Sequence, residues 1–145
     1  MTESIETKLA ANPIGHYPHA KRVGNLLFLS GIGPRSALDN SIAGNVYDDH
    51  GMLLSYDIEQ QCHAVFANVK AVLQASGVQW AELIDITVYL TNMGKDFPVY
   101  NQIWAEYFPD SANAPCRTTL GINALPTQIA IELKCIALAE QKSCC

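Results

Sequence analysis

The chain has 145 residues, of which 49% are hydrophobic and 16% are charged, and its formal net charge is −5. This length suits one domain with one core, and the composition is that of a globular protein rather than a disordered one. The acidic balance argues against a nucleic-acid-binding protein, because phosphate contacts require a basic surface. We expect a single domain over residues 1–145, with flexible ends at about residues 1–12 and 140–145.

The first half of the chain predicts a strand, a long loop and a helix. Residues 26–30 are a short apolar run bounded by glycines, which is typical of a buried strand. Residues 31–54 are rich in turn signals, and a loop of this length is uncommon unless it has a function, so we expect it to shape a pocket. A helix is predicted over residues 57–76, where Asp57 begins a capping box and Gly77 provides the stop.

The second half predicts strands around a second helix. Residues 84–90 alternate between apolar and polar side chains, as in a half-buried strand. An aromatic face over residues 97–107 indicates a helix, and strands are predicted over 118–122 and 129–139. This order favours an α+β fold with both helices on one face of a sheet. The opposite face then lacks a cover, and self-association would supply one.

The ends and the cysteines of the chain indicate a reduced cytoplasmic protein. The polar start over residues 1–13 holds no signal-peptide run. No segment approaches the roughly 20 apolar residues of a membrane helix. The five cysteines lack disulfide or zinc spacing, and the last two, Cys144 and Cys145, lie in a polar tail. We therefore expect a cytoplasmic location and no membrane partner.

The usual signatures of metal and cofactor chemistry are missing from the sequence. The four histidines, His16, His19, His50 and His63, form no recognised ligand pair. There is no GxSxG motif, no phosphate-binding glycine loop and no dinucleotide fingerprint. We expect neither a metal nor a cofactor.

Two charged residues near the end of the chain are the best candidates for chemistry. Arg117 stands where a proline-containing loop enters a strand, and its guanidinium can hold a carboxylate through two parallel hydrogen bonds. Glu132 lies on the last predicted strand, two residues before Lys134. Each also fits a plainer interpretation, a solvated surface arginine and a charge pair at a sheet edge. The residue types alone leave both interpretations open.

An ordered set of short segments resembles the RidA (YjgF-like) family over nearly the whole chain. The segments are GHY at 15–17, VGNLLFLSG at 23–31, NVKAVL at 68–73, TVYLT at 87–91, YNQIW at 100–104 and APCRTT at 114–119. The resemblance implies a chorismate-mutase-like α+β fold and a homotrimer with active sites at the subunit interfaces. It also implies that Arg117 binds a substrate carboxylate, that Glu132 positions the attacking water, and that Tyr17 lines the pocket.

Further residues resemble, more narrowly, the 2-aminomuconate deaminase subgroup. They are Tyr17-Pro18-His19, Lys21-Arg22, Arg35 and the segment DNSIAG at 39–44. This resemblance implies hydrolysis of the carbon–nitrogen bond of 2-aminomuconate, giving 4-oxalocrotonate and ammonia in aromatic catabolism. The substrate has two carboxylates, and Arg35, Arg22 and His19 are the candidates for binding the second. Cys116, beside Arg117, is a candidate to line the pocket.

Several alternatives stay open at this stage. The chain could be a general 2-imino or 2-enamino acid deaminase that clears reactive intermediates, or a module on the same trimer that binds a small carboxylate without turnover. Arg35 and Arg22 could equally be solvent-exposed, and His19 could be a hydrogen-bonded structural histidine. In every case the expected partners are a small carboxylate and further copies of the chain, and not a nucleic acid.

Overall fold

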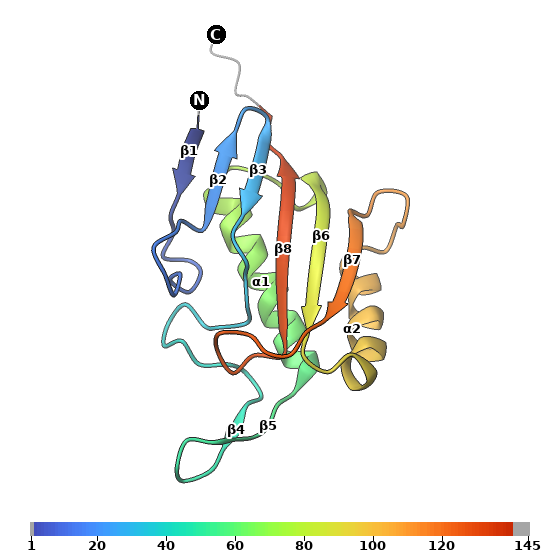
Figure 1. Ribbon diagram of the computed structural model, residues 1–145. Helices are drawn as coiled ribbons and strands as arrows, with labels where there is room; N and C mark the ends of the chain where they lie inside the picture. Colours follow the sequence, from blue (N-terminus) through green and yellow to red (C-terminus); the bar gives the residue numbers. More distant parts are fainter. Residues whose placement is uncertain (1, 141–145) are drawn as a thin grey trace.

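The computed structural model describes residues 2–140, which form a mixed six-stranded sheet, a two-stranded hairpin and two helices (Figure 1). The strands are β1 (Thr2–Ile5), β2 (Ala20–Val23), β3 (Leu26–Leu29), β4 (Val46–Tyr47), β5 (Leu53–Ser55), β6 (Leu83–Leu90), β7 (Cys116–Gly121) and β8 (Ile131–Leu138). The helices are α1 (Ile58–Ala75) and α2 (Met93–Tyr107), and a short 3-10 helix spans Trp80–Glu82. The sheet order is β1-β2-β3-β8-β6-β7, and only β6 and β7 run parallel.

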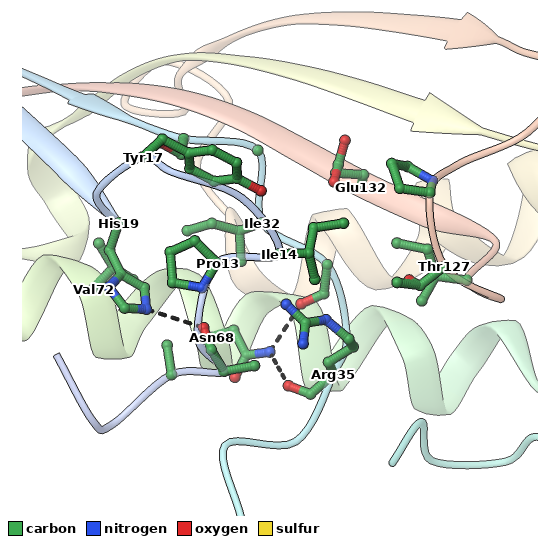
Figure 2. A pocket seen from close by; sticks show the side chains of 17 residues that line it. Pro13, Ile14, Tyr17, His19, Ile32, Arg35, Asn68, Val72, Thr127 and Glu132 are labelled. Atoms are coloured by element: carbon green, nitrogen blue, oxygen red, sulfur yellow. Dashed lines mark hydrogen bonds between the residues drawn. The ribbon is translucent and has the colours of Figure 1, made fainter. Parts of the chain in front are cut away.

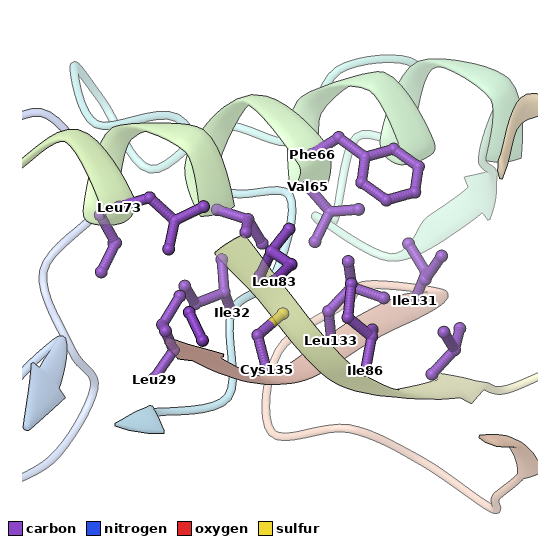
Figure 3. Close-up of a cluster of buried hydrophobic side chains, with 14 of the residues drawn as sticks. Leu29, Ile32, Val65, Phe66, Leu73, Leu83, Ile86, Ile131, Leu133 and Cys135 are labelled. Carbon is purple, nitrogen blue, oxygen red and sulfur yellow. The ribbon is translucent and has the colours of Figure 1, made fainter. Parts of the chain in front are cut away.

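Helix α1 forms where its sequence pattern predicts it. The side chain of Asp57 accepts a hydrogen bond from the backbone of Gln60, which satisfies a free donor of the first turn. Gly77 follows the helix with a φ of +70°, a left-handed conformation that favours glycine. The apolar stripe of α1, which includes Phe66 and Leu73, packs on the buried side chains of β6 and β8 (Figure 3).

The two helices lie on one face of the sheet, as predicted, and the other face is uncovered within residues 2–140 (Figure 1). In β8, Ile131, Leu133 and Cys135 are fully buried, whereas the alternate residues Glu132 and Lys134 are only half-buried. Because successive side chains of a strand point to opposite faces, the half-buried set lies away from the helices. An uncovered face of this kind is consistent with self-association, and the homotrimer stays a prediction.

The α+β fold is confirmed, but the sequence missed β1, β2 and the hairpin of β4 and β5. The expected flexible end at residues 1–12 is wrong for residues 2–5, which form β1 and pair with β2 along their whole length. The predicted loop 31–54 contains the hairpin of β4 and β5. No helix in the part of the chain that the structure describes combines the length and apolar character needed to cross a membrane. Cys144 and Cys145 lie outside the described residues.

Candidate active site

A cavity of about 240 Å³ opens where β3 separates from β8. The two strands pair up to Phe28, and contact resumes only as an isolated bridge between Ile32 and Leu133. Four residue steps from Phe28 to Ile32 match three on β8 from Ile136 to Leu133, so the regular pairing is interrupted there, and Ser30 and Gly31 line the pocket. Its remaining walls come from the N-terminal segment 10–19, the middle of α1 and the loop 126–129 (Figure 2).

The Glu132 carboxylate lies in this cavity, directly beside Gly31. A Cβ atom added to Gly31 would stand 3.0 Å from Cδ of Glu132, so the absence of a side chain makes the approach possible. No hydrogen bond or ion pair with residues 2–140 holds this carboxylate, and burial raises its pKa above the usual range. A carboxylate with a raised pKa is a stronger base, and its oxygens are free to bind water or substrate.

Tyr17 is the second predicted residue in the cavity. Its ring lies close to Gly15, where an added Cβ would come within 2.9 Å of the ring edge. The residue is 44% exposed, so its hydroxyl remains accessible to a ligand. Figure 2 shows this hydroxyl on the side of the ring that faces Glu132. The structure therefore brings Tyr17 and Glu132 into one pocket.

His19 is a structural histidine rather than a ligand for a carboxylate. Its Nε2 donates to the backbone oxygen of Ala11 at 3.0 Å, and its Nδ1 accepts from the backbone nitrogen of Thr7 at 3.3 Å. The carbonyl can only accept and the amide can only donate, so these contacts fix a neutral ring with the proton on Nε2. The prediction that His19 binds the second carboxylate is wrong for this conformation, because the ring instead fastens the wall of the cavity.

Of the two extra arginines, only Arg35 reaches the cavity. Its guanidinium donates to Oδ1 of Asn40 at 2.9 Å and to the backbone oxygen of Asn12 at 2.6 Å, and it lies on the α1 side of the pocket (Figure 2). These contacts use two of its five donors and leave others for a ligand. Arg22 points to the helix face, where it donates to the backbone oxygen of Ser76. Its predicted role as a substrate ligand is therefore wrong for the cavity of its own chain.

Arg117 and Glu132 do not meet within one chain. Arg117 lies on the edge strand β7 beside Ile86, a buried residue of the helix face. Its guanidinium carbon stands 5.2 Å from the ring centre of Tyr100 and 5.0 Å from that of Trp104. Glu132 points to the opposite face of the sheet. Cys116, which precedes Arg117, is exposed at the start of β7 and does not line the cavity.

Sequence reasoning missed the part played by Asn68. This α1 residue lines the cavity and donates to the backbone oxygens of Gly33 at 2.8 Å and Arg35 at 2.7 Å, so it anchors the loop that carries Arg35. A signal was available, because this asparagine lies at the edge of the apolar stripe of α1, three residues after Val65 and four before Val72. Among residues 2–140, no three histidine, cysteine, aspartate or glutamate side chains lie close enough together to share a metal ion.

The sheet order, the two helices on one face and a small cavity with a half-buried carboxylate define an α+β protein with a cavity beside its sheet. The predicted RidA (YjgF-like) family is confirmed: a family model described as Endoribonuclease L-PSP matches residues 7–139, and the chain belongs to this family.

Known proteins of the same kind match almost end to end. A RutC family protein of Pyrococcus horikoshii is 36% identical over 143 residues, which are 97% of this chain and all of the relative. A 2-iminobutanoate/2-iminopropanoate deaminase of Dermatophagoides farinae is 31% identical, over 94% of this chain and 95% of the relative. The crystal structure of E. coli TdcF with bound serine has a TM-score of 0.80 and 26% identity, over 95% of this chain and 99% of that one.

Proposed function

We propose that the protein is a deaminase that hydrolyses the carbon–nitrogen bond of small 2-imino and 2-enamino acids, releasing ammonia and a 2-oxo acid. The observation that carries the proposal is the unpaired carboxylate of Glu132 in a small cavity beside Tyr17. The names of two similar proteins support it, since one is an imino acid deaminase and the other binds serine, a compound of the same size and charge type. The net charge of −5 argues against an RNA substrate.

The chemistry asked of the residues is modest. An enamine becomes an imine when its adjacent carbon is protonated, and water then attacks the imine carbon. Glu132 accepts a proton from that water and passes it to the nitrogen, which gives a carbinolamine. Transfer of the hydroxyl proton to the same nitrogen then breaks the carbon–nitrogen bond, so that ammonia leaves and a carbonyl group remains. The raised pKa of Glu132 suits both steps, because it brings the carboxyl group closer to the working pH.

The substrate carboxylate needs a cation, and we propose that it comes from Arg117 of a neighbouring copy. Arg117 lies on the edge strand β7, while the sheet face that carries Glu132 is uncovered. Packing between the rings of Tyr100 and Trp104 orients the guanidinium and leaves its N–H edge available for a carboxylate. In a homotrimer this arrangement would give three equivalent sites, each with Glu132 from one chain and Arg117 from the next, and with Cys116 at the same edge.

The direct test uses the purified protein and freshly generated 2-iminopropanoate. We expect ammonia and pyruvate to be released faster than in the uncatalysed reaction, without any added metal or cofactor. Binding of a small carboxylate with no gain in turnover would instead indicate a binding module, and would overturn the proposed enzyme activity.

A second candidate substrate, 2-aminomuconate, is favoured by the position of Arg35. Among the cations expected to bind its second carboxylate, Arg35 shares the cavity with Glu132. We expect Arg35→Ala to reduce turnover of 2-aminomuconate much more than turnover of 2-iminopropanoate. Arg35→Gln, which keeps a donor for the Asn12 carbonyl, controls for loosening of the loop. Equal losses on both substrates would remove the role of Arg35 and leave the general imino acid deaminase.

A further inference from the structure

Gln61 is a fully buried polar side chain in the first turn of α1, on the core-facing side of the helix. Both ends of its amide group are paired: Oε1 accepts from the backbone nitrogen of Ala130 at 2.8 Å, and Nε2 donates to Oδ1 of Asn45 at 3.0 Å. A glutamine among residues such as Val65 and Phe66 is costly unless each polar atom has a partner. These two bonds account for its presence there.

Asn45 continues the same network to the loop that precedes β8. Its Nδ2 donates to the backbone oxygen of Gln128 at 2.9 Å and to the hydroxyl of Tyr47 at 3.0 Å. Together, Gln61 and Asn45 hold residues 128 and 130 of this loop. Ile129 lies between these two residues and Thr127 directly before them, and both line the cavity. Glu132 follows two residues after Ala130.

The segment that carries Asn45 also forms the opposite wall of the cavity. Arg35 and Ile42 form an isolated β-bridge, and the backbone of Asn45 donates to Ile42 at 3.1 Å. Between them, Gly44 has a φ of +82°, and a Cβ atom there would stand 2.5 Å from Cβ of Asp57. The loop therefore passes so close to the start of α1 at Gly44 that only glycine fits there. This close approach brings Asn45 within hydrogen-bonding distance of Gln61.

We propose that Gln61 and Asn45 are positioning residues, which fix the spacing between the Arg35 wall and the Glu132 wall of the cavity. The inference rests on the proposed function. It adds that the reaction depends on the hydrogen bonds by which the buried Gln61 side chain links the loop that carries Asn45 to residues 128–130. Neither side chain lines the cavity, so each acts through the backbone of residues 128–130. A small displacement of this backbone moves Glu132 relative to the reacting carbon, which geometry-dependent catalysis does not tolerate.

The test compares Gln61→Met and Asn45→Ala with two matched controls. Methionine has a similar shape but makes neither hydrogen bond. Gln74→Met repeats the substitution at an exposed site of α1, and Cys62→Ala removes buried volume from the neighbouring position. We expect kcat for 2-iminopropanoate to fall about 10- to 100-fold in Gln61→Met with little change in KM. Both controls should keep kcat near the wild-type value, even where Cys62→Ala lowers the melting temperature.

The double variant distinguishes a shared network from two separate effects. Because both residues act on one loop, Gln61→Met with Asn45→Ala should lose little more activity than the worse single variant. Losses that multiply would overturn the link, and so would a folded Gln61→Met protein with wild-type kcat. If Gln61→Met does not fold, Asn45→Ala decides the question, because Asn45 is only half-buried and its substitution removes one hydrogen-bond partner of Gln61 but no side chain of the apolar core.

Hydrogen exchange gives a readout that does not require turnover. The amide of Ala130 donates to Gln61, so exchange in residues 126–132 should accelerate in Gln61→Met and stay unchanged in Cys62→Ala. Unaltered exchange would contradict the positioning role. A wild-type protein that hydrolyses no imine would overturn the proposed function instead, while the exchange data would still show whether the pair holds the loop.

Discussion

Gly31→Ala is the smallest change that should disturb the proposed catalytic carboxylate. The added Cβ would stand 3.0 Å from Cδ of Glu132 and 3.1 and 3.3 Å from its two oxygens, whereas ordinary van der Waals contact begins at 3.4 Å. Gly31 does not have a positive φ, so alanine fits its backbone without strain. The clash therefore acts on the carboxyl group and not on the fold.

The magnitude follows from the geometry. The carboxyl group must retreat by about half an ångström, and a misplacement of about 1 Å costs roughly 100-fold in rate. We therefore expect kcat to fall about 10-fold, equivalent to about 1.4 kcal/mol. The added methyl group also removes water from the carboxylate, which raises the pKa of Glu132 further. Because the base must be deprotonated, the rising limb of the pH–rate profile should move to higher pH.

The assay measures kcat against pH with 2-iminopropanoate, together with the melting temperature. Gly94→Ala is the matched control, because a Cβ atom at that position meets nothing within 4 Å. The control should keep the wild-type kcat and pH profile. A folded Gly31→Ala protein with unchanged kcat and an unshifted profile would refute the assignment of Glu132 as the base.

Two more substitutions test the roles of individual side chains. Glu132→Gln should lower kcat by about 10²- to 10⁴-fold with KM largely unchanged, and a wild-type rate would point to another base. Since burial raises the pKa of Glu132 in the folded protein, its carboxyl group favours folding at low pH and loses that contribution as the pH rises from about 4 toward neutrality. Denaturant titrations should therefore show a smaller loss of stability over that range for Glu132→Gln. His19→Ala should lower the free energy of unfolding by about 1–3 kcal/mol, because it leaves the Thr7 amide and the Ala11 carbonyl without their partner. An unchanged unfolding midpoint would show that the N-terminal wall is held by other contacts.

The sequence predicted those helices and strands in which apolar and polar side chains follow a clear periodic pattern. The three- and four-residue spacing on α1 and the alternation in β6 and β8 indicate burial on one side, and the structure buries those sides. The exception is Ile84, which is exposed because the register of β6 shifts between Leu83 and Asp85. Strand β1 carries no such signal, because Ile5 is its only buried residue and it is held by backbone pairing with β2. The hairpin of β4 and β5 is likewise short and largely exposed, so its sequence resembles a loop.

The site could be predicted only in part, and the reasons are geometric. Tyr17, Arg35 and Glu132 were expected in the pocket and lie there. Whether Arg22 faces the cavity depends on the register of β2, since a shift of one residue moves a side chain to the other face of the sheet. The partners of His19 are backbone groups in an irregular segment, which no side-chain pattern reveals. The proposed pairing of Glu132 from one copy with Arg117 from another depends on how copies of the chain pack together, which no local sequence pattern reveals.

We propose that one catalytic site takes Glu132 from one copy and Arg117 from another, and mixed assemblies test this arrangement most directly. Arg117→Ala and Glu132→Gln are each expected to be nearly inactive, with Arg117→Ala losing about 2–5 kcal/mol of transition-state stabilisation. When the two variants are co-expressed in equal amounts and mixed trimers are purified through two different tags, each mixed trimer should have one site of three that combines both native residues. We expect these mixed trimers to have about one third of the wild-type activity. Mixed assemblies no more active than the separate variants would contradict it.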